Sequence, residues 1–216
     1  MLAMKMAIYD LDKTLVRHAT FTPFLVYAAR RLSLWRLLLL PVWVLMMLGY
    51  RARFYDRTAL KTAGMKLMLG RHSVHRLEEM GEGFAEHHLK KSGWIKPIVD
   101  LMEEDRARGA QILVATAAFQ FYAKAFARRL SIEKVIGTRW DGEGIPGGNC
   151  YGETKRARVA EFLGEDFPLA AVRFVSDSFA DAPLLNEVGE PVFVTSSRRK
   201  RARAEALGWS VIDPDI

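Results

Sequence analysis

Short, mostly apolar runs recur along the chain and predict the strands of a buried sheet. The clearest runs occupy residues 5–10, 111–115, 171–176 and 191–195, and their lengths are typical of strands covered on both faces. Shorter strands are predicted at 134–137 and 209–212. Apolar positions spaced three to four residues apart predict the helices between them, at 97–108, 119–130 and 154–163, after Phe179, and up to Ala206. Strands alternating with helices predict a parallel α/β sheet with helices on both faces.

Residues 19–92 interrupt this alternation, because they form a series of helical patterns without a convincing strand. Asp56 or Thr58 could cap a helix that stops near Gly70, and Ser73 begins another. We therefore predict a Rossmann-like core made of residues 1–15 and 94–216. A helical cap, residues 16–93, is inserted after the first strand.

The composition agrees with one globular domain and indicates the cellular compartment in which the protein lies. Half of the 216 residues are apolar, which is enough for a sizeable core. The single cysteine, Cys150, cannot form an internal disulfide, and this suits a reducing compartment. Asp10 and Asp12 argue against a secretory signal peptide at the start of the sequence. The expected location is cytoplasmic.

Positive charge is concentrated in the predicted cap. Residues 16–93 carry 13 Lys and Arg against 5 Asp and Glu, and residues 16–55 contain arginines but no acidic residue. Such a segment attracts anions, whether nucleic acid, anionic lipid or an acidic substrate. A second basic run, residues 196–201, lacks the regularly spaced aromatic residues that stack on bases. We therefore expect no nucleic-acid partner.

The basic segment contains a continuous apolar run, Leu37–Leu48, with Pro41 inside it. As a helix of 12 residues it would extend about 18 Å, less than the roughly 30 Å hydrocarbon core of a bilayer. It should not span a membrane alone. It could be a buried helical hairpin, or an amphipathic surface that holds the protein peripherally on the inner face of a membrane. A buried helix is the commoner case, but Trp35, Trp43, Met46, Met47 and the flanking arginines raise the membrane interpretation above its usual frequency.

The candidate chemistry begins with Asp10-Leu11-Asp12-Lys13-Thr14, at the end of the first predicted strand. Strand side chains alternate between faces, so Asp10 and Asp12 point the same way and can reach one point. Two close carboxylates repel each other, and such a site raises one pKa or takes up a cation. Alone, the pattern would fit a solvated turn equally well.

Other polar residues follow neighbouring predicted strands, where ligands bind to sheets of this kind. They are Thr116 after strand 111–115, Asp177, Ser178 and Asp181 after strand 171–176, and Lys155 at the start of a helix. Each suits phosphoryl transfer. Asp10 would be the nucleophile and Asp12 the proton donor and acceptor. Thr116 and Lys155 would hold phosphate, and Asp177 with Asp10 would bind Mg²⁺.

These motifs, in this order, resemble the haloacid dehalogenase superfamily, whose four motifs are a D-x-D, a Thr or Ser, a Lys and a paired-Asp segment. The resemblance implies that the backbone carbonyl of Asp12 also binds Mg²⁺ and that Asp181 is an outer or minor ligand. Thr14 and Ser178 would support the site. An acid at Asp12 implies a phosphatase rather than a dehalogenase. The inserted helices look like the cap of the phosphoserine phosphatase-like branch.

Two departures from that branch concern the substrate. Ser176 stands where phosphoserine phosphatases usually have Gly, and residues 16–55 offer no acid for a substrate ammonium. More loosely, the chain is similar to bacterial phosphatidylglycerophosphate phosphatases of the superfamily. A basic cap near an anionic surface gains about 1 kcal/mol per nearby Lys or Arg.

The expected function is a Mg²⁺-dependent phosphomonoesterase that forms an aspartyl-phosphate and acts on a lipid-like phosphate. The alternatives are a soluble small-molecule phosphatase, such as one for phosphoserine, and a membrane-associated binding protein without catalysis. The sequence predicts neither the oligomeric state nor a role for Lys13.

Overall fold

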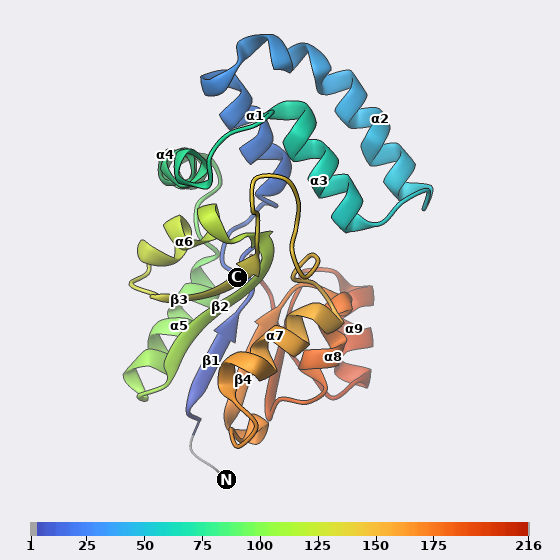
Figure 1. Cartoon of the computed structure of the whole chain (residues 1–216). Coiled ribbons are helices and arrows are strands. Elements are labelled where there is room, and N and C mark those ends of the chain that lie inside the picture. The colour runs from blue at the N-terminus through green and yellow to red at the C-terminus, as the bar shows by residue number, and fades with distance from the viewer. Residues whose placement is uncertain (1–3, 216) are drawn as a thin grey trace.

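The computed structural model describes residues 4–215 and contains a six-stranded sheet whose strands are all parallel. The strands lie in the order β3-β2-β1-β4-β5-β6, and β1 to β4 are labelled in Figure 1. Their bounds are β1 Met6–Tyr9, β2 Gln111–Phe119, β3 Lys134–Thr138, β4 Val172–Ser176, β5 Glu190–Val194 and β6 Ser210–Ile212. The predicted α/β class and parallel sheet are confirmed.

Strand β1 lies at the centre of the sheet, and its register brings the candidate motifs together. Tyr9 pairs with Val114 of β2 on one side and with Val175 of β4 on the other. The next residue, Asp10, donates its backbone N–H to the carbonyl of Val175 at 2.9 Å. All three strands therefore deliver their polar residues to the same carboxyl edge.

Helices cover both faces of the sheet, as the alternating pattern predicts. Helices α5 and α6 pack on one face, and α7, α8 and α9 pack on the other. The core helices are α5 Lys96–Ala107, α6 Gln120–Arg128, α7 Glu153–Leu163, α8 Ala182–Leu185 and α9 Arg198–Ala206, with 3₁₀ turns η2 Leu169–Ala171 and η3 Phe179–Asp181. Most bounds agree with the predicted ones within two residues.

The helical insert after β1 is also confirmed, and it lies beyond the carboxyl edge of the sheet (Figure 1). It consists of α1 Phe21–Leu32, η1 Leu34–Leu39, α2 Leu40–Arg51, α3 Arg57–Met68 and α4 Val74–Ser92. Asp56, one of the two predicted caps, accepts the N–H of Ala59 at 2.7 Å at the start of α3. Ser73 caps α4 through the N–H of Arg76, as expected.

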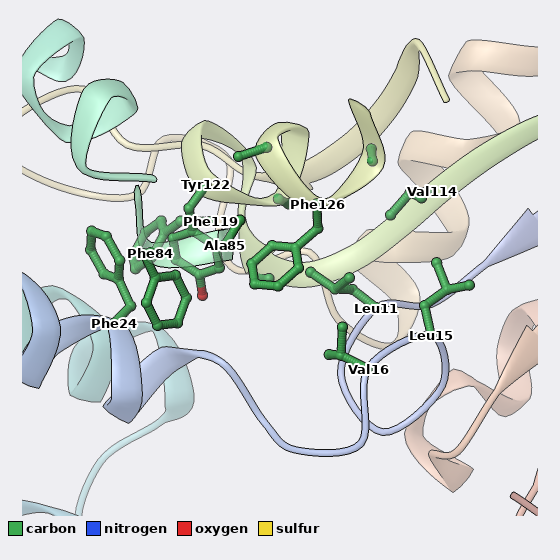
Figure 2. Close-up of a cluster of buried hydrophobic side chains, with 14 of the residues drawn as sticks. Leu11, Leu15, Val16, Phe24, Phe84, Ala85, Val114, Phe119, Tyr122 and Phe126 are labelled. Carbon is green, nitrogen blue, oxygen red and sulfur yellow. The ribbon is translucent and has the colours of Figure 1, made fainter. Parts of the chain in front are cut away.

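One hydrophobic cluster runs without interruption from the sheet into the insert (Figure 2). The ring of Phe24 on α1 lies 5.3 Å from that of Phe84 on α4 and 4.8 Å from that of Tyr122 on α6. Leu11 and Leu15, inside the Asp10 to Thr14 loop and just after it, are buried in the same cluster. The loop that carries the first motif is thus fixed by packing on both sides.

Strand β2 is longer than its apolar run suggests. Hydrogen bonding to β3 continues to Phe119, with an irregular register between Ala115 and Phe119. Thr116, predicted to follow the strand, therefore lies inside it. The small residues Ala117 and Ala118 fit a strand as well as a loop, so the pattern gave no signal for its end.

The apolar run of the insert is the other main difference. Together η1 and α2 make a helical stretch, Leu34–Arg51, whose length and composition would suit a membrane span, and only 6% of it is buried. This stretch exceeds the predicted 12-residue run because helix continues through both flanks. Trp43, expected as an interfacial residue, is 1% exposed and packs against Phe21, with ring centroids 5.7 Å apart. Trp35 stays exposed.

Candidate active site

A cavity of about 260 Å³ opens at the carboxyl edge of β1, β2 and β4. Five of the predicted site residues line it, namely Asp10, Asp12, Thr116, Asp177 and Ser178. Lys155, Asp181 and Thr14 are buried side chains outside this lining. The structure thus brings residues from four separate parts of the chain to one small polar site.

Asp10 is the most enclosed carboxylate of the cavity wall, with 6% of the residue exposed. Its Oδ1 accepts the backbone N–H of Leu11 at 2.7 Å, and its Oδ2 lies 3.3 Å from Nζ of Lys155. Burial raises the pKa of Asp10 to about 7; Lys155 opposes the rise, and the neighbouring Asp side chains add to it. This carboxylate therefore needs cations around it to stay ionised.

The raised pKa of Asp10 predicts how metal-free protein responds to pH. The unfolded chain loses this proton near pH 4, whereas the folded protein keeps it to about pH 7. The folded state therefore binds more protons between these values, and its stability should fall as pH rises through them. We expect a lower melting temperature at pH 8 than at pH 5 in chelator, and a smaller fall in Asp10→Asn. As a control, Asp166→Asn, at an exposed position, should lose as much melting temperature between pH 5 and pH 8 as the wild type. An equal loss in Asp10→Asn would contradict the assignment of the raised pKa to Asp10.

Lys155 lies behind Asp10 at the start of α7 and is 1% exposed. Its Nζ donates to Oδ2 of Asp181 at 2.7 Å, and the hydroxyl of Ser176 donates to the same oxygen at 2.7 Å. Burial lowers the pKa of Lys155, but Asp10 and Asp181 raise it by more, so it stays protonated. Ser176, the departure from the phosphoserine phosphatase pattern, thus helps to hold Asp181 against the lysine.

Asp12 is held by a residue that the sequence did not indicate. Its Oδ1 accepts the backbone N–H of Thr20 at 2.9 Å and the Thr20 hydroxyl at 2.8 Å. Thr20 is fully buried, directly before α1, and also lies 3.2 Å from the Tyr122 hydroxyl. A Thr at a helix start is an ordinary capping residue, so its position alone could not reveal this second use.

Thr116 and Asp177 complete the cavity wall beside Asp10. The Thr116 oxygen accepts the backbone N–H of Ala118 at 3.1 Å, which leaves the hydroxyl hydrogen able to donate to a bound oxygen. Burial raises the pKa of Asp177 to about 6, and Lys13 is the strongest of the cations that oppose the rise. Lys13 thereby acquires a place at the site, with a left-handed backbone at φ 57°.

Several lining residues come from outside the four motifs. Arg57 at the start of α3, Tyr151 before α7 and Lys200 on α9 all face the cavity. The Arg57 guanidinium lies 4.4 Å from the centre of the Tyr151 ring. Lys200 belongs to the basic run 196–201, so part of that run faces the site. Together with Lys13, Arg57 and Lys200 place cations at three positions of the cavity wall, which suits a phosphate ligand.

The candidate ligands for magnesium are few and are all oxygen atoms. Across residues 4–215, no three His, Cys, Asp or Glu side chains gather as a metal cluster. The predicted set has only two such side chains, Asp10 and Asp177, with the backbone carbonyl of Asp12. Mg²⁺ is commonly held by one or two carboxylates and keeps several waters or phosphate oxygens. Oδ1 of Asp181 is buried without a partner among the described residues. The hard oxygen donors and raised carboxylate pKa values fit such an ion.

Comparison with known proteins agrees with the motifs. The model of the haloacid dehalogenase-like hydrolase family matches residues 7–186. The chain is 30% identical to protein CicA of Caulobacter vibrioides over 199 residues, which cover 86% of this chain and 85% of that protein. It is 28% identical to phosphoserine phosphatase SerB1 of Mycobacterium tuberculosis over an alignment of 223 positions, which covers 96% of this chain and 70% of that protein. A solved Bordetella pertussis protein of unknown function superposes with a TM-score of 0.81 at 26% identity, covering 98% and 99%.

The chain belongs to the haloacid dehalogenase-like hydrolase family. Its helical insert lies directly after β1, as in the phosphoserine phosphatase-like branch, and one of its relatives is a phosphoserine phosphatase. The predicted family, fold and enzyme class are therefore confirmed.

Proposed function

We propose that the protein hydrolyses phosphomonoesters through an aspartyl-phosphate on Asp10. The observation that carries this is the shared cavity in which Asp10, Asp12 and Thr116 meet, with the buried Lys155 cation behind Asp10. A carboxylate oxygen of Asp10 attacks phosphorus, the bond from phosphorus to the leaving oxygen breaks, and Asp12 protonates that oxygen. Asp12 then takes a proton from water as the water attacks the same phosphorus. The products are an alcohol and inorganic phosphate, and Asp10 is regenerated.

Mg²⁺ is the proposed cofactor, held by the Asp10 and Asp177 carboxylates and the Asp12 backbone carbonyl. When bound, it would neutralise charge on the phosphate oxygens and favour the ionised forms of both carboxylates. Thr116 would donate its hydroxyl hydrogen to a phosphate oxygen. Lys155 would keep Asp10 ionised from behind through its 3.3 Å contact, and Asp181 and Ser176 would orient the lysine.

The substrate that we favour is a small soluble phosphomonoester. The comparison with a phosphoserine phosphatase supports this class, and it supports it better than the lipid-like phosphate favoured by the sequence interpretation. Phosphoserine itself fits this cavity poorly, because its ammonium group would lack an acidic partner from the insert. The cavity lining brings Lys13, Arg57 and Lys200 beside its Asp residues, and the insert supplies no acid to it for an ammonium group.

A lipid-like phosphate is the second candidate, because one surface of the insert suits an anionic membrane. We call it the apolar surface; its exposed large side chains are Leu34, Trp35, Leu38, Val42, Val44, Leu45, Leu48 and Phe54. Exposed arginines border it, namely Arg30, Arg31, Arg51 and Arg53. Apolar side chains rimmed by Arg are typical of peripheral membrane binding to anionic lipid.

A substrate panel tests the function and separates the two candidates. Phosphatidylglycerophosphate in vesicles, phosphoserine, sugar phosphates and an aryl phosphate would be assayed with Mg²⁺ and with excess chelator. We expect hydrolysis of soluble phosphates with Mg²⁺, its loss in chelator, and protein that stays in the supernatant when anionic vesicles are pelleted. Preferential hydrolysis of the lipid and pelleting that Leu38→Glu abolishes, but Phe162→Glu does not, would select the second candidate. Full activity in excess chelator would refute the proposed role of Mg²⁺.

A further inference from the structure

A second cavity, about 480 Å³, adjoins the first between the insert and the loop after β1. Both cavities are lined by Asp12, Lys13, Ala19 and Arg57. The remaining wall comes from the insert, namely Phe21, Thr22, Pro23, Trp43, Met47, Tyr50, Arg51, Leu60 and Lys61. A phosphate bound at Asp10 would therefore direct the rest of its molecule past Asp12 into this second space.

Lys61 is an unusual member of this wall, because it is a lysine of the insert with only 3% exposed. Its Nζ crosses to the core and donates to the carbonyl of Ala117 at 2.5 Å and to Oδ1 of Asn149 at 2.9 Å. It lies 5.4 Å from the ring centre of Phe21 and 5.2 Å from that of Phe119. Both hydrogen-bond acceptors are neutral.

No carboxylate forms an ion pair with Lys61 within residues 4–215, although sixteen such pairs occur elsewhere in that part of the chain. A buried cation without an anion is costly, since removal from water is compensated only in part by neutral acceptors. An ammonium has three N–H donors, and two are used here. The remaining donor and the uncompensated charge are available to a ligand in the cavity.

The rest of the wall agrees with an anionic, partly apolar ligand. The indole N–H of buried Trp43 has no acceptor among the residues that the structure describes. Arg51 and Arg57 add positive charge to the wall, whereas Asp12 is its one acid. Phe21 and Met47 supply apolar contact surface. An ammonium group placed here would meet four cationic side chains and a single carboxylate.

We propose that the second cavity binds the leaving group of the substrate, and that this group carries an anionic oxygen function beside an apolar portion. Lys61 is its cationic partner and a specificity-determining residue. The inference rests on the proposed phosphatase function and names its substrate class. A carboxylate and a phosphodiester share the required chemistry.

The environment of Lys61 also predicts a pH dependence. Burial lowers the pKa of Lys61 to about 7; Arg57 lowers it further, and Asp12, Cys150 and Asp10 act in the opposite direction. Only the protonated lysine pairs with an anion. The preference for an anionic leaving group should therefore be greatest below pH 7 and should decline above it. The ratio of two substrates measured at one pH removes the titrations of the phosphate and of the Asp residues.

Matched aryl phosphates test the proposal in Mg²⁺ buffer. They would carry a carboxylate, a hydroxymethyl or an aminomethyl group at the same ring position, and kcat/KM would be measured for each. We expect the carboxylate to exceed the hydroxymethyl substrate at least tenfold, as a charge-assisted hydrogen bond provides, and the aminomethyl substrate to be the poorest.

Lys61→Met should lower the carboxylate-to-hydroxymethyl ratio about tenfold, and Lys61→Arg should restore much of it. Loss of fold would lower both rates together without changing the ratio, so the ratio reports on specificity. Lys66→Met, on the exposed side of the same helix, is the matched control. It should change neither the two rates nor their ratio. A wild-type ratio within threefold of one, or an unchanged ratio in Lys61→Met, would overturn the inference alone. No hydrolysis of any of the three would instead refute the phosphatase proposal.

Discussion

The Asp10→Asn variant should lose turnover by more than about 10⁴-fold. An amide oxygen cannot form the acyl phosphate, and general acid or base help alone contributes only about 10² to 10⁴. The change is nearly isosteric, and it removes a carboxylate that is buried with Lys155 3.3 Å away. Steady-state hydrolysis of an aryl phosphate at saturating Mg²⁺ gives the measurement.

Two controls make the Asp10 result specific. Asp166→Asn, at an exposed position, should retain wild-type rates. The folded state of Asp10→Asn is checked by its melting temperature at pH 8, which should be no lower than that of the wild type, because a poorly solvated carboxylate has been removed. Activity within tenfold of wild type would show that another group is the nucleophile.

The Asp12→Asn variant should separate the two chemical steps. With an alkyl phosphate, loss of the proton donor should lower kcat by about 10² to 10⁴. With nitrophenyl phosphate the leaving group departs without a proton, so the first step persists while hydrolysis of the intermediate is slow. The aspartyl-phosphate should then accumulate.

A stopped-flow burst of nitrophenolate, equal in amount to enzyme, would report this accumulation. Asp10→Asn should show no burst, since it cannot form the intermediate. If Asp12→Asn showed neither a burst nor a slower steady state, the carboxylate that Thr20 holds would have no part in proton transfer. The backbone carbonyl of residue 12 is unchanged by the substitution, so magnesium binding should persist.

The sequence was sufficient to predict the sheet and the residues at its carboxyl edge. Strand β1 is wholly apolar and β4 is apolar apart from Arg173 and Ser176. Acidic residues follow each strand at once, so Asp10, Asp12 and Asp177 could be assigned to one edge. Alternation of side chains placed Asp10 and Asp12 on the same side. These signals are local, and local patterns survive folding unchanged.

The residues whose roles the sequence did not reveal depend on contacts between elements far apart in the chain. In the sequence, Lys61 resembles one more surface lysine of an amphipathic helix. In the fold, its ammonium group reaches the carbonyl of Ala117 in β2 and the side chain of Asn149. Thr20 resembles an ordinary helix cap until it meets Asp12. Trp43 was misplaced because α2 is apolar on nearly all sides, so its periodicity could not tell which face the protein buries.

The continuous aromatic cluster bears on how such enzymes could be diversified. Phe24 of α1 and Phe84 of α4 share one core with Tyr122 of α6 (Figure 2). Grafting the whole insert onto a related phosphatase would therefore expose apolar surface unless the recipient's α6 were redesigned with it. Exchange of η1, α2 and α3 alone leaves that cluster largely intact and replaces most of the second cavity's wall. Recombination libraries with junctions after α1 and before α4 should yield far more folded enzymes than libraries cut at the ends of the insert.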